Sequence, residues 1–227
     1  MFDLSPQELE AIRLSLKVAG VATLATLPLA VLAGYALSRD FPGRGALNAI
    51  THLPLVLPPV VTGYALLLLF GRHGPLGVFF AEDFGLVFAF RWTGAALAAA
   101  TMSFPLLVRP IRLSFEAVDP RLTLAARSLG AGRLSSFLLV ELPLALPGVF
   151  AGVVLGFAKA LGEFGATITF VSNIPGETRT IPAAIYSLIQ TPGGDADALR
   201  LVLVATAIAT GALFFSEALQ RRAGRRA

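Results

Sequence analysis

Five long apolar stretches, separated by polar segments, dominate the pattern of the chain. None contains Asp, Glu, Lys or Arg: they span Val18–Leu37 and the intervals Arg44 to Arg72, Arg91 to Arg109, Glu141 to Lys159 and Arg200 to Glu217. A helix needs roughly 20 apolar residues to cross a bilayer core. The first two stretches meet that length, and the other three are slightly short, although charged residues at their ends can reach the headgroups. The pattern therefore predicts an all-α, polytopic membrane protein.

Five membrane-spanning helices account for these stretches. We expect them at residues 12–37, 47–70, 92–112, 142–171 and 199–219. The fourth is long, and we expect it to break or tilt near Gly162. The uncharged run Thr180 to Gly194 is expected to form a helix at the membrane surface. A sixth span, either there or at Phe84 to Phe90, is the alternative.

The basic residues indicate an orientation. Loop 38–46, the middle segment 113–141 with its flank, and the C-terminal tail alternate correctly for five spans, and they hold 11 of the 18 Lys and Arg residues: Arg39, Arg44, Arg109, Arg112, Arg121, Arg127, Arg133, Arg221, Arg222, Arg225 and Arg226. Cytoplasmic loops carry an excess of such residues. We therefore expect these regions and the C-terminus in the cytoplasm, and the N-terminus outside.

Composition excludes several other classes of protein. The chain is 56% hydrophobic and only 14% charged, whereas a soluble domain carries about 25% charged residues. There is no Cys, and His52 and His73 lie far apart, so neither a disulfide framework nor a metal site is expected. No basic patch interleaved with aromatic residues suggests a nucleic-acid partner, and the formal net charge of +4 is interpreted as a topology signal.

The middle segment 113–141 is too polar to span, yet it is rich in Ala and Leu. Asp119 and Pro120 can start a helix there, as cap and first helical residue, and Gly130 can end it. An apolar face at helical spacing follows from Leu122, Ala125, Ala126 and Leu129. Such a helix outside the membrane either fills a groove on a partner or lies on the headgroups; the physical pattern leaves both open.

The same segment resembles the "EAA" motif of ABC importer permeases, which reads E-A-A, three residues, G, nine residues, I-x-L-P. The matching positions are Ala125, Ala126, Gly130, Val140, Leu142 and Pro143, with Leu124 in place of the motif's Glu and Val140 in place of Ile. The resemblance implies that these residues form the coupling helix and its flank, which dock on an ATPase subunit.

Three further segments are similar to the molybdate branch of these permeases, a branch related to sulfate permeases. They are H-L-P-L-V-L-P-P-V-V-T-G-Y (His52 to Tyr64), L-G-E-F-G-A-T-I-T-F-V-S-N-I-P-G-E-T-R-T-I-P (Leu161 to Pro182) and I-Q-T-P-G-G (Ile189 to Gly194). The resemblance covers essentially the whole chain. It implies a single transmembrane domain, residues 1–227, with the type I ABC importer permease fold, in the bacterial inner membrane.

The resemblance also implies partners. These are a second permease copy, two ABC ATPases, a periplasmic oxyanion-binding protein and membrane lipid. The chain carries no G-x-x-x-x-G-K-[ST] phosphate-binding loop and no credible nucleophile set. We therefore expect no catalysis and no cofactor in this subunit, with ATP and Mg²⁺ bound by the partner ATPase.

Five residues are candidates for the translocation pathway. Pro58 and Pro59 remove backbone donors and should kink the second span near Thr62, as either a pathway-facing bend or a packing kink. Lys159 and Glu163 share a helix face, as either a self-neutralising ion pair or a pathway lining. Conduction requires weak binding, so in the second case Glu163 would keep Lys159 from trapping an anion.

Some alternatives remain open from the sequence. A glycine ridge at Gly148, Gly152 and Gly156 permits close helix contact, either within the subunit or at a two-fold interface. Sulfate, thiosulfate or tungstate are alternative substrates. A gradient-driven secondary transporter and a membrane enzyme are the alternatives from other classes; the first is disfavoured because the two halves show no internal repeat.

Overall fold

The computed structural model describes residues 4–224, except for the side chains of residues 213 and 215–224. Across that range the secondary structure is entirely helical. The elements are α1 (Pro6–Leu37), α2 (Arg44–Val56), α3 (Pro59–Phe70), α4 (Pro75–Phe84), α5 (Trp92–Glu116), α6 (Pro120–Ser128), α7 (Arg133–Ser136), the π-helical turn η1 (Phe137–Glu141), α8 (Leu142–Leu161), α9 (Gly165–Val171), α10 (Ile181–Leu188) and α11 (Asp195–Gly224). The all-α prediction is confirmed.

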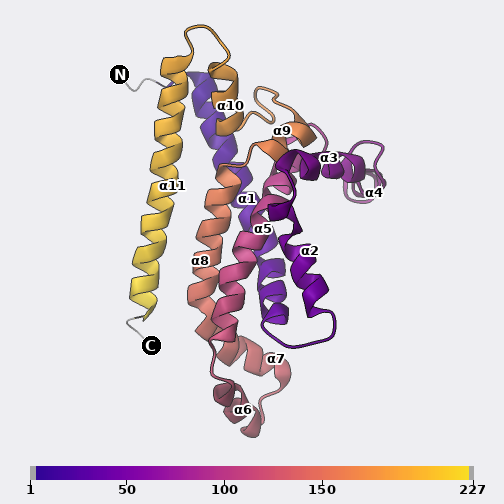
Figure 1. Cartoon of the computed structure of the whole chain (residues 1–227), viewed down its shortest axis with the longest axis vertical. Helices are drawn as coiled ribbons and strands as arrows, with labels where there is room; N and C mark the ends of the chain where they lie inside the picture. The colour runs from indigo at the N-terminus through magenta and orange to yellow at the C-terminus, as the bar shows by residue number, and fades with distance from the viewer. Residues whose placement is uncertain (1–3, 225–227) are drawn as a thin grey trace.

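Three long helices form the centre of the molecule: α5 packs against both α1 and α8. In Figure 1 they run along the long axis, and α11 lies alongside, where it contacts α8 and α10. The start of α1 lies at one end together with α10, and α6 and α7 lie at the other end (Figure 1). The long helices therefore connect the end that holds α10 with the end that holds α6 and α7.

The glycine ridge of α8 brings it close to α5 within the same subunit. A β-carbon at Gly148 would lie 2.5 Å from the carbonyl oxygen of Pro110, and one at Gly152 would lie 2.7 Å from that of Leu107. A β-carbon at Gly156 would lie 2.2 Å from Leu107 Cδ1. Real side chains do not approach so closely, so only glycine permits this packing. Of the two readings left open by the sequence, this geometry selects the contact within the subunit.

The predicted span 47–70 is not one continuous helix. It divides into α2 and α3, which are bent by 111° relative to each other. A proline disfavours the helical conformation of the residue before it, and two prolines in succession act on Leu57 and Pro58, whose ψ angles are 142° and 135°. The predicted kink at Pro58-Pro59 is therefore confirmed and proves to be a complete break of the helix, and whether the two halves together form one span remains a prediction.

The predicted span 142–171 also breaks, at the place expected. Helix α8 ends at Leu161 and α9 begins at Gly165. At the surface-helix position 180–194 the structure has only the shorter α10, and this helix is not free. It packs on α1 and α11, with Ile181 buried and its amide donating to Ser15 Oγ at 2.6 Å.

The number of spans remains a prediction. Among the residues that the structure describes, α1, α5 and the helix Arg133–Leu161 are long and apolar enough to cross a membrane, and the bent pair α2–α3 makes up to four. The spans also extend beyond their predicted bounds, since α5 continues to Glu116 and the helix that includes α8 starts at Arg133. The expected count of five is not confirmed.

The packing of α8 on α5 predicts opposite effects for two glycine substitutions. Gly152→Ala should lower the free energy of unfolding by about 1–3 kcal/mol, the usual cost of overpacking, because the added carbon meets backbone that cannot move aside. Gly20→Ala in α1 is the control: its β-carbon would have nothing within 4 Å, so it should be neutral or slightly stabilising. Thermal unfolding in detergent measures both. Equal melting temperatures for the two variants would contradict the α5–α8 contact.

Candidate functional site

The short helix α6 begins and ends as its sequence predicts. Asp119 caps it by accepting a hydrogen bond from the Arg121 amide at 2.9 Å, and Pro120 is its first residue. Gly130 follows the helix with φ at +91°, a left-handed conformation that is nearly free for glycine. The helix therefore ends abruptly, and the chain turns back toward α8.

The apolar face of α6 points away from the rest of the chain. On that face Leu122 is 48% exposed and Leu129 is 89% exposed, and Leu124, which lies off the face, is 64% exposed. Ala125 is exposed and Ala126 half-buried, whereas Thr123 is buried. An apolar face with no cover inside its own chain is typical of a helix that fills a groove on a partner.

The remaining motif residues lie where the chain re-enters the bundle. Val140 belongs to the π-helical turn η1, and Leu142 and Pro143 start α8. Val140 and Leu142 are half-buried and Pro143 is exposed. The two arms of the motif are thus adjacent in space, since α6 contacts η1. Figure 1 places both at the same end of the molecule.

Charged side chains gather at this end and tie its elements together. Arg44 pairs with Asp40 at 2.5 Å and with Glu116, at the end of α5, at 3.1 Å. Arg112 pairs with the same Glu116 at 2.8 Å and donates to Asn48 of α2 at 3.1 Å. The basic residues of loop 38–46 and of α5 thus lie together at one end of the molecule, in agreement with their grouping in the charge pattern.

Another contact at this end was missed by the sequence reasoning. Glu141 is 1% exposed, pairs with Arg39 and accepts a hydrogen bond from Thr123 Oγ1 at 3.2 Å. The sequence marked Glu141 only as the end of an apolar stretch. The signal that could have found it is a carboxylate placed between two apolar motif residues, Val140 and Leu142.

The two helix breaks meet each other. A β-carbon at Gly165 of α9 would lie 2.7 Å from Pro59 Cβ, and one at Gly63 of α3 would lie 2.4 Å from the carbonyl oxygen of Ala166. Thr62, next to Gly63, is buried, and within the described chain its hydroxyl has no hydrogen-bond partner. The structure therefore brings Pro59 and Thr62 to the same junction as α9.

Glu163 lies at that junction and makes two interactions. Its Oε2 accepts from Lys159 Nζ at 2.5 Å, and its Oε1 accepts from the Ala166 amide at 3.0 Å, at the start of α9. Glu163 is 3% exposed, whereas the Lys159 side chain is 30% exposed. The carboxylate therefore links α8 to α9, and Lys159 is the more exposed member of the pair.

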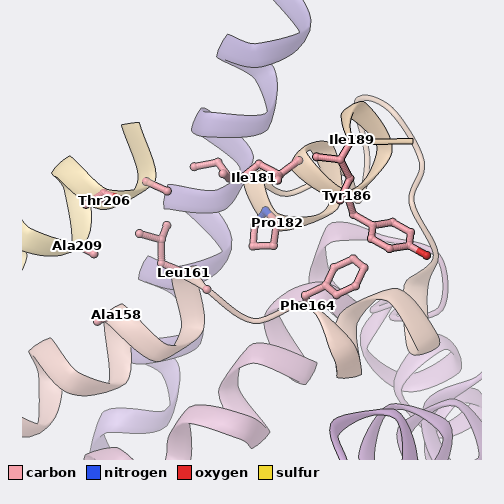
Figure 2. A pocket seen from close by; sticks show the side chains of 12 residues that line it. Ala158, Leu161, Phe164, Ile181, Pro182, Tyr186, Ile189, Thr206 and Ala209 are labelled. Carbon is pink, nitrogen blue, oxygen red and sulfur yellow. The ribbon is translucent and has the colours of Figure 1, made fainter. Parts of the chain in front are cut away.

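A separate hollow between α8, α10 and α11 is unsuited to an anion. Figure 2 shows its lining, which includes Leu161, Phe164, Pro182, Tyr186 and Ile189. The volume is about 520 Å³, and no charged residue lines it. A buried anion requires paired charges or hydrogen-bond donors, so the charged groups at the helix breaks are better candidates for a substrate path.

The chain is similar to known transport proteins over nearly its whole length. The family described as "Binding-protein-dependent transport system inner membrane component" matches residues 26–227. The chain is 56% identical to the molybdenum transport system permease protein ModB of Escherichia coli (strain K12), over 98% of this chain and 99% of that protein. It is 37% identical to the sulfate transport system permease protein CysT of Salmonella typhimurium, over 98% of this chain and 80% of that protein.

A solved structure shares the fold. It is the bacterial alginate ABC transporter in complex with an alginate pentasaccharide-bound periplasmic protein, at a TM-score of 0.75 and 17% identity, over 97% of this chain and 81% of that chain. At this level of identity the likeness concerns the fold alone. It agrees with the expected ABC importer permease architecture.

The junction at Glu163 predicts unequal effects for its two partners. Lys159→Met should lower the free energy of unfolding by about 1–3 kcal/mol, because it leaves a buried carboxylate without its counter-charge. Glu163→Gln should cost less, since an amide oxygen can still accept from the Ala166 amide and the partly exposed Lys159 is not left buried without a counter-charge. Thermal unfolding in detergent compares them, with Lys159→Met/Glu163→Gln as the control that removes both charges. A Glu163→Gln loss as large as that of Lys159→Met would contradict this assignment.

Proposed function

Because the chain belongs to the family of binding-protein-dependent transport system inner membrane components, we propose that it is the membrane-spanning permease subunit of an ABC importer for molybdate. The observation that supports molybdate as the substrate is the 56% identity, over nearly the full length of both proteins, to a molybdenum permease. Identity to a sulfate permease is lower, at 37%. Molybdate is therefore favoured over sulfate, thiosulfate or tungstate. In this proposal the subunit has no enzymatic role. Membership of this family argues against the two alternatives, a secondary transporter and a membrane enzyme.

Energy comes from a separate ATPase in this proposal. The exposed leucines of α6 fill a groove on each ATPase subunit, and the ATPase binds ATP and Mg²⁺. When ATP closes the ATPase pair, α6 moves with it. Support comes from the unpartnered apolar face of α6 and from the absence of a phosphate-binding loop in the sequence.

Two copies of the chain enclose the substrate path in this proposal. Two-fold assemblies are the commonest oligomers, and exposed apolar side chains on α2 and α3, such as Ile50, Val56 and Val60, offer surface for a second copy. Irregular backbone at membrane depth is tolerated only where protein or water covers it. We therefore place the path beside the helix breaks at Pro58-Pro59 and Glu163, with Lys159 lowering the barrier for an anion.

The substrate is delivered by a periplasmic oxyanion-binding protein in this proposal. The alginate transporter of the same fold is described in complex with a periplasmic protein. The receiving face is then the end that holds α10 and the start of α1 (Figure 1). The domain proposed for this role is the whole range 1–227, and the family match covers 26–227 of it.

Uptake tests the function, and Gly130 tests the coupling. With its ATPase and an oxyanion-binding protein in vesicles, the wild-type chain should take up labelled molybdate, and excess sulfate should compete poorly. Gly130→Val should weaken association with the ATPase by roughly tenfold and reduce uptake, because a β-carbon in the left-handed conformation costs about 1–2 kcal/mol. Co-purification followed by uptake measures both effects.

Gly132→Val is the matched control for that experiment. Gly132 lies two residues further on, has φ at −67°, and like Gly130 has nothing within 4 Å of an added β-carbon. It should therefore retain association and uptake. Wild-type association and uptake in Gly130→Val would mean that α6 is not the coupling helix. Sulfate uptake that molybdate cannot inhibit would overturn molybdate as the proposed substrate.

Orientation can be tested because the chain contains no Cys. The basic loops favour α6 in the cytoplasm and the start of α1 outside, and the exposed residues Gln7 and Arg127 lie at these two ends. Gln7→Cys should react with an impermeant thiol reagent added from the periplasm, and Arg127→Cys should react only after the membrane is opened. The reverse labelling would refute the orientation. The predicted cytoplasmic tail at Arg225 and Arg226 lies outside the described residues.

A further inference from the structure

Glu141 is a buried carboxylate at the joint between the cytoplasmic helix and the membrane helices. It is 1% exposed, which is costly for a charge unless partners surround it. Both of its oxygens have partners: Oε2 pairs with Arg39 Nη2, and Oε1 accepts from Thr123 Oγ1 at 3.2 Å. One side chain thus joins three elements: η1, α6 and the loop that follows α1.

The link to Thr123 is unusual for α6. Among the side chains that the structure describes, which excludes residues 213 and 215–224, the bond between Thr123 Oγ1 and Glu141 Oε1 is the one side-chain hydrogen bond that connects α6 to another helix. Leu122 and Leu124, the neighbours of Thr123, are exposed. A movement imposed on α6 from outside therefore reaches the bundle through this bond and through the backbone on either side, which leads back to α5 and on to α7 and η1.

Arg39, the other partner of Glu141, is held by an aromatic cluster. Its guanidinium carbon lies 5.1 Å from the ring centre of Tyr35. Tyr35 in turn packs edge-on against Phe115 of α5 and Phe137 of η1, at 5.3 and 4.7 Å between ring centres. Aromatic pairs at such distances are favourable and rigid. The end of α1, the end of α5 and η1 therefore behave as one packed unit at this face.

The backbone at Glu141 is irregular as well. Phe137–Glu141 forms a π-helical turn, in which the Leu142 amide donates to the Phe137 carbonyl. Such turns are rare and occur frequently at functional sites. This one interrupts the otherwise continuous helix Arg133–Leu161 between α7, which follows α6, and the membrane-spanning α8.

We propose that Glu141 is the positioning residue that transmits the movement of α6 to the membrane helices, through Thr123 on one side and Arg39 on the other. The inference rests on the proposed function as an ABC permease. The motif's own Glu is absent here, because the exposed Leu124 stands in its place. Glu141 brings a carboxylate to α6 from the other arm of the motif.

The test is the number of ATP molecules hydrolysed per molybdate transported, in vesicles that hold the complete transporter. Glu141→Gln and Thr123→Val should each raise this ratio by about tenfold, within the usual range of coupling between sites. Association with the ATPase and the melting temperature should stay near wild type. Thr123→Ser retains the hydroxyl and should keep the wild-type ratio, as should Arg44→Gln, which breaks ion pairs at the same face that do not involve α6.

Arg39→Gln/Glu141→Gln tests whether the two residues act together. If they form one path, the double variant should be no worse than Glu141→Gln alone. A wild-type ratio in Glu141→Gln would overturn the inference, as would a ratio that changes only in proportion to lost assembly or lost thermal stability. If the wild-type complex itself takes up no molybdate, the proposed function fails instead, and the two failures are therefore distinguishable.

Discussion

Backbone hydrogen bonding in a water-free environment is the constraint on which this structure depends. A helix satisfies its own amides, whereas a break exposes polar groups that lipid cannot satisfy. The chain breaks two of its apolar segments, after Val56 and after Leu161, and packs the following helices, α3 and α9, against each other. Glu163 supplies an acceptor to α9 where the backbone ladder stops. Each break is thus covered by the other.

Buried carboxylates hold the two ends of α8. Glu163 lies just beyond its C-terminal end and is neutralised by Lys159, and Glu141 immediately precedes its first residue and is neutralised by Arg39. Both charges are buried, so removing either cation alone is costly. The span between them is bound to α5 through its glycine ridge. Helix α8 is therefore a tightly fitted element between the cytoplasmic helix α6 and the broken region that we propose as the path.

Prediction from the sequence succeeded where local chemistry decides the outcome. The cap at Asp119, the turn at Gly130 and the break near Gly162 follow from residues adjacent in the chain, and all appear in the structure. For residues 47–70 the sequence predicted a kink and not a complete break, because the prolines mark the position of the bend but not its 111° size: Leu57, Pro58 and Pro59 are all apolar, yet two prolines end the helix. The Glu141 contact was missed because Arg39 lies 102 residues away.

The sequence by itself determined that this is an apolar, all-helical chain whose basic residues concentrate in alternate polar segments, and it carried the motifs that indicate an ABC permease. These are properties of composition and spacing, and no folding is needed to recognise them. Only the tertiary structure decided that the glycine ridge faces α5, that Pro59 meets Gly165, and that Glu141 joins α6 to Arg39. Those contacts depend on how rigid helices pack, and helix packing pairs residues that have no relation along the chain.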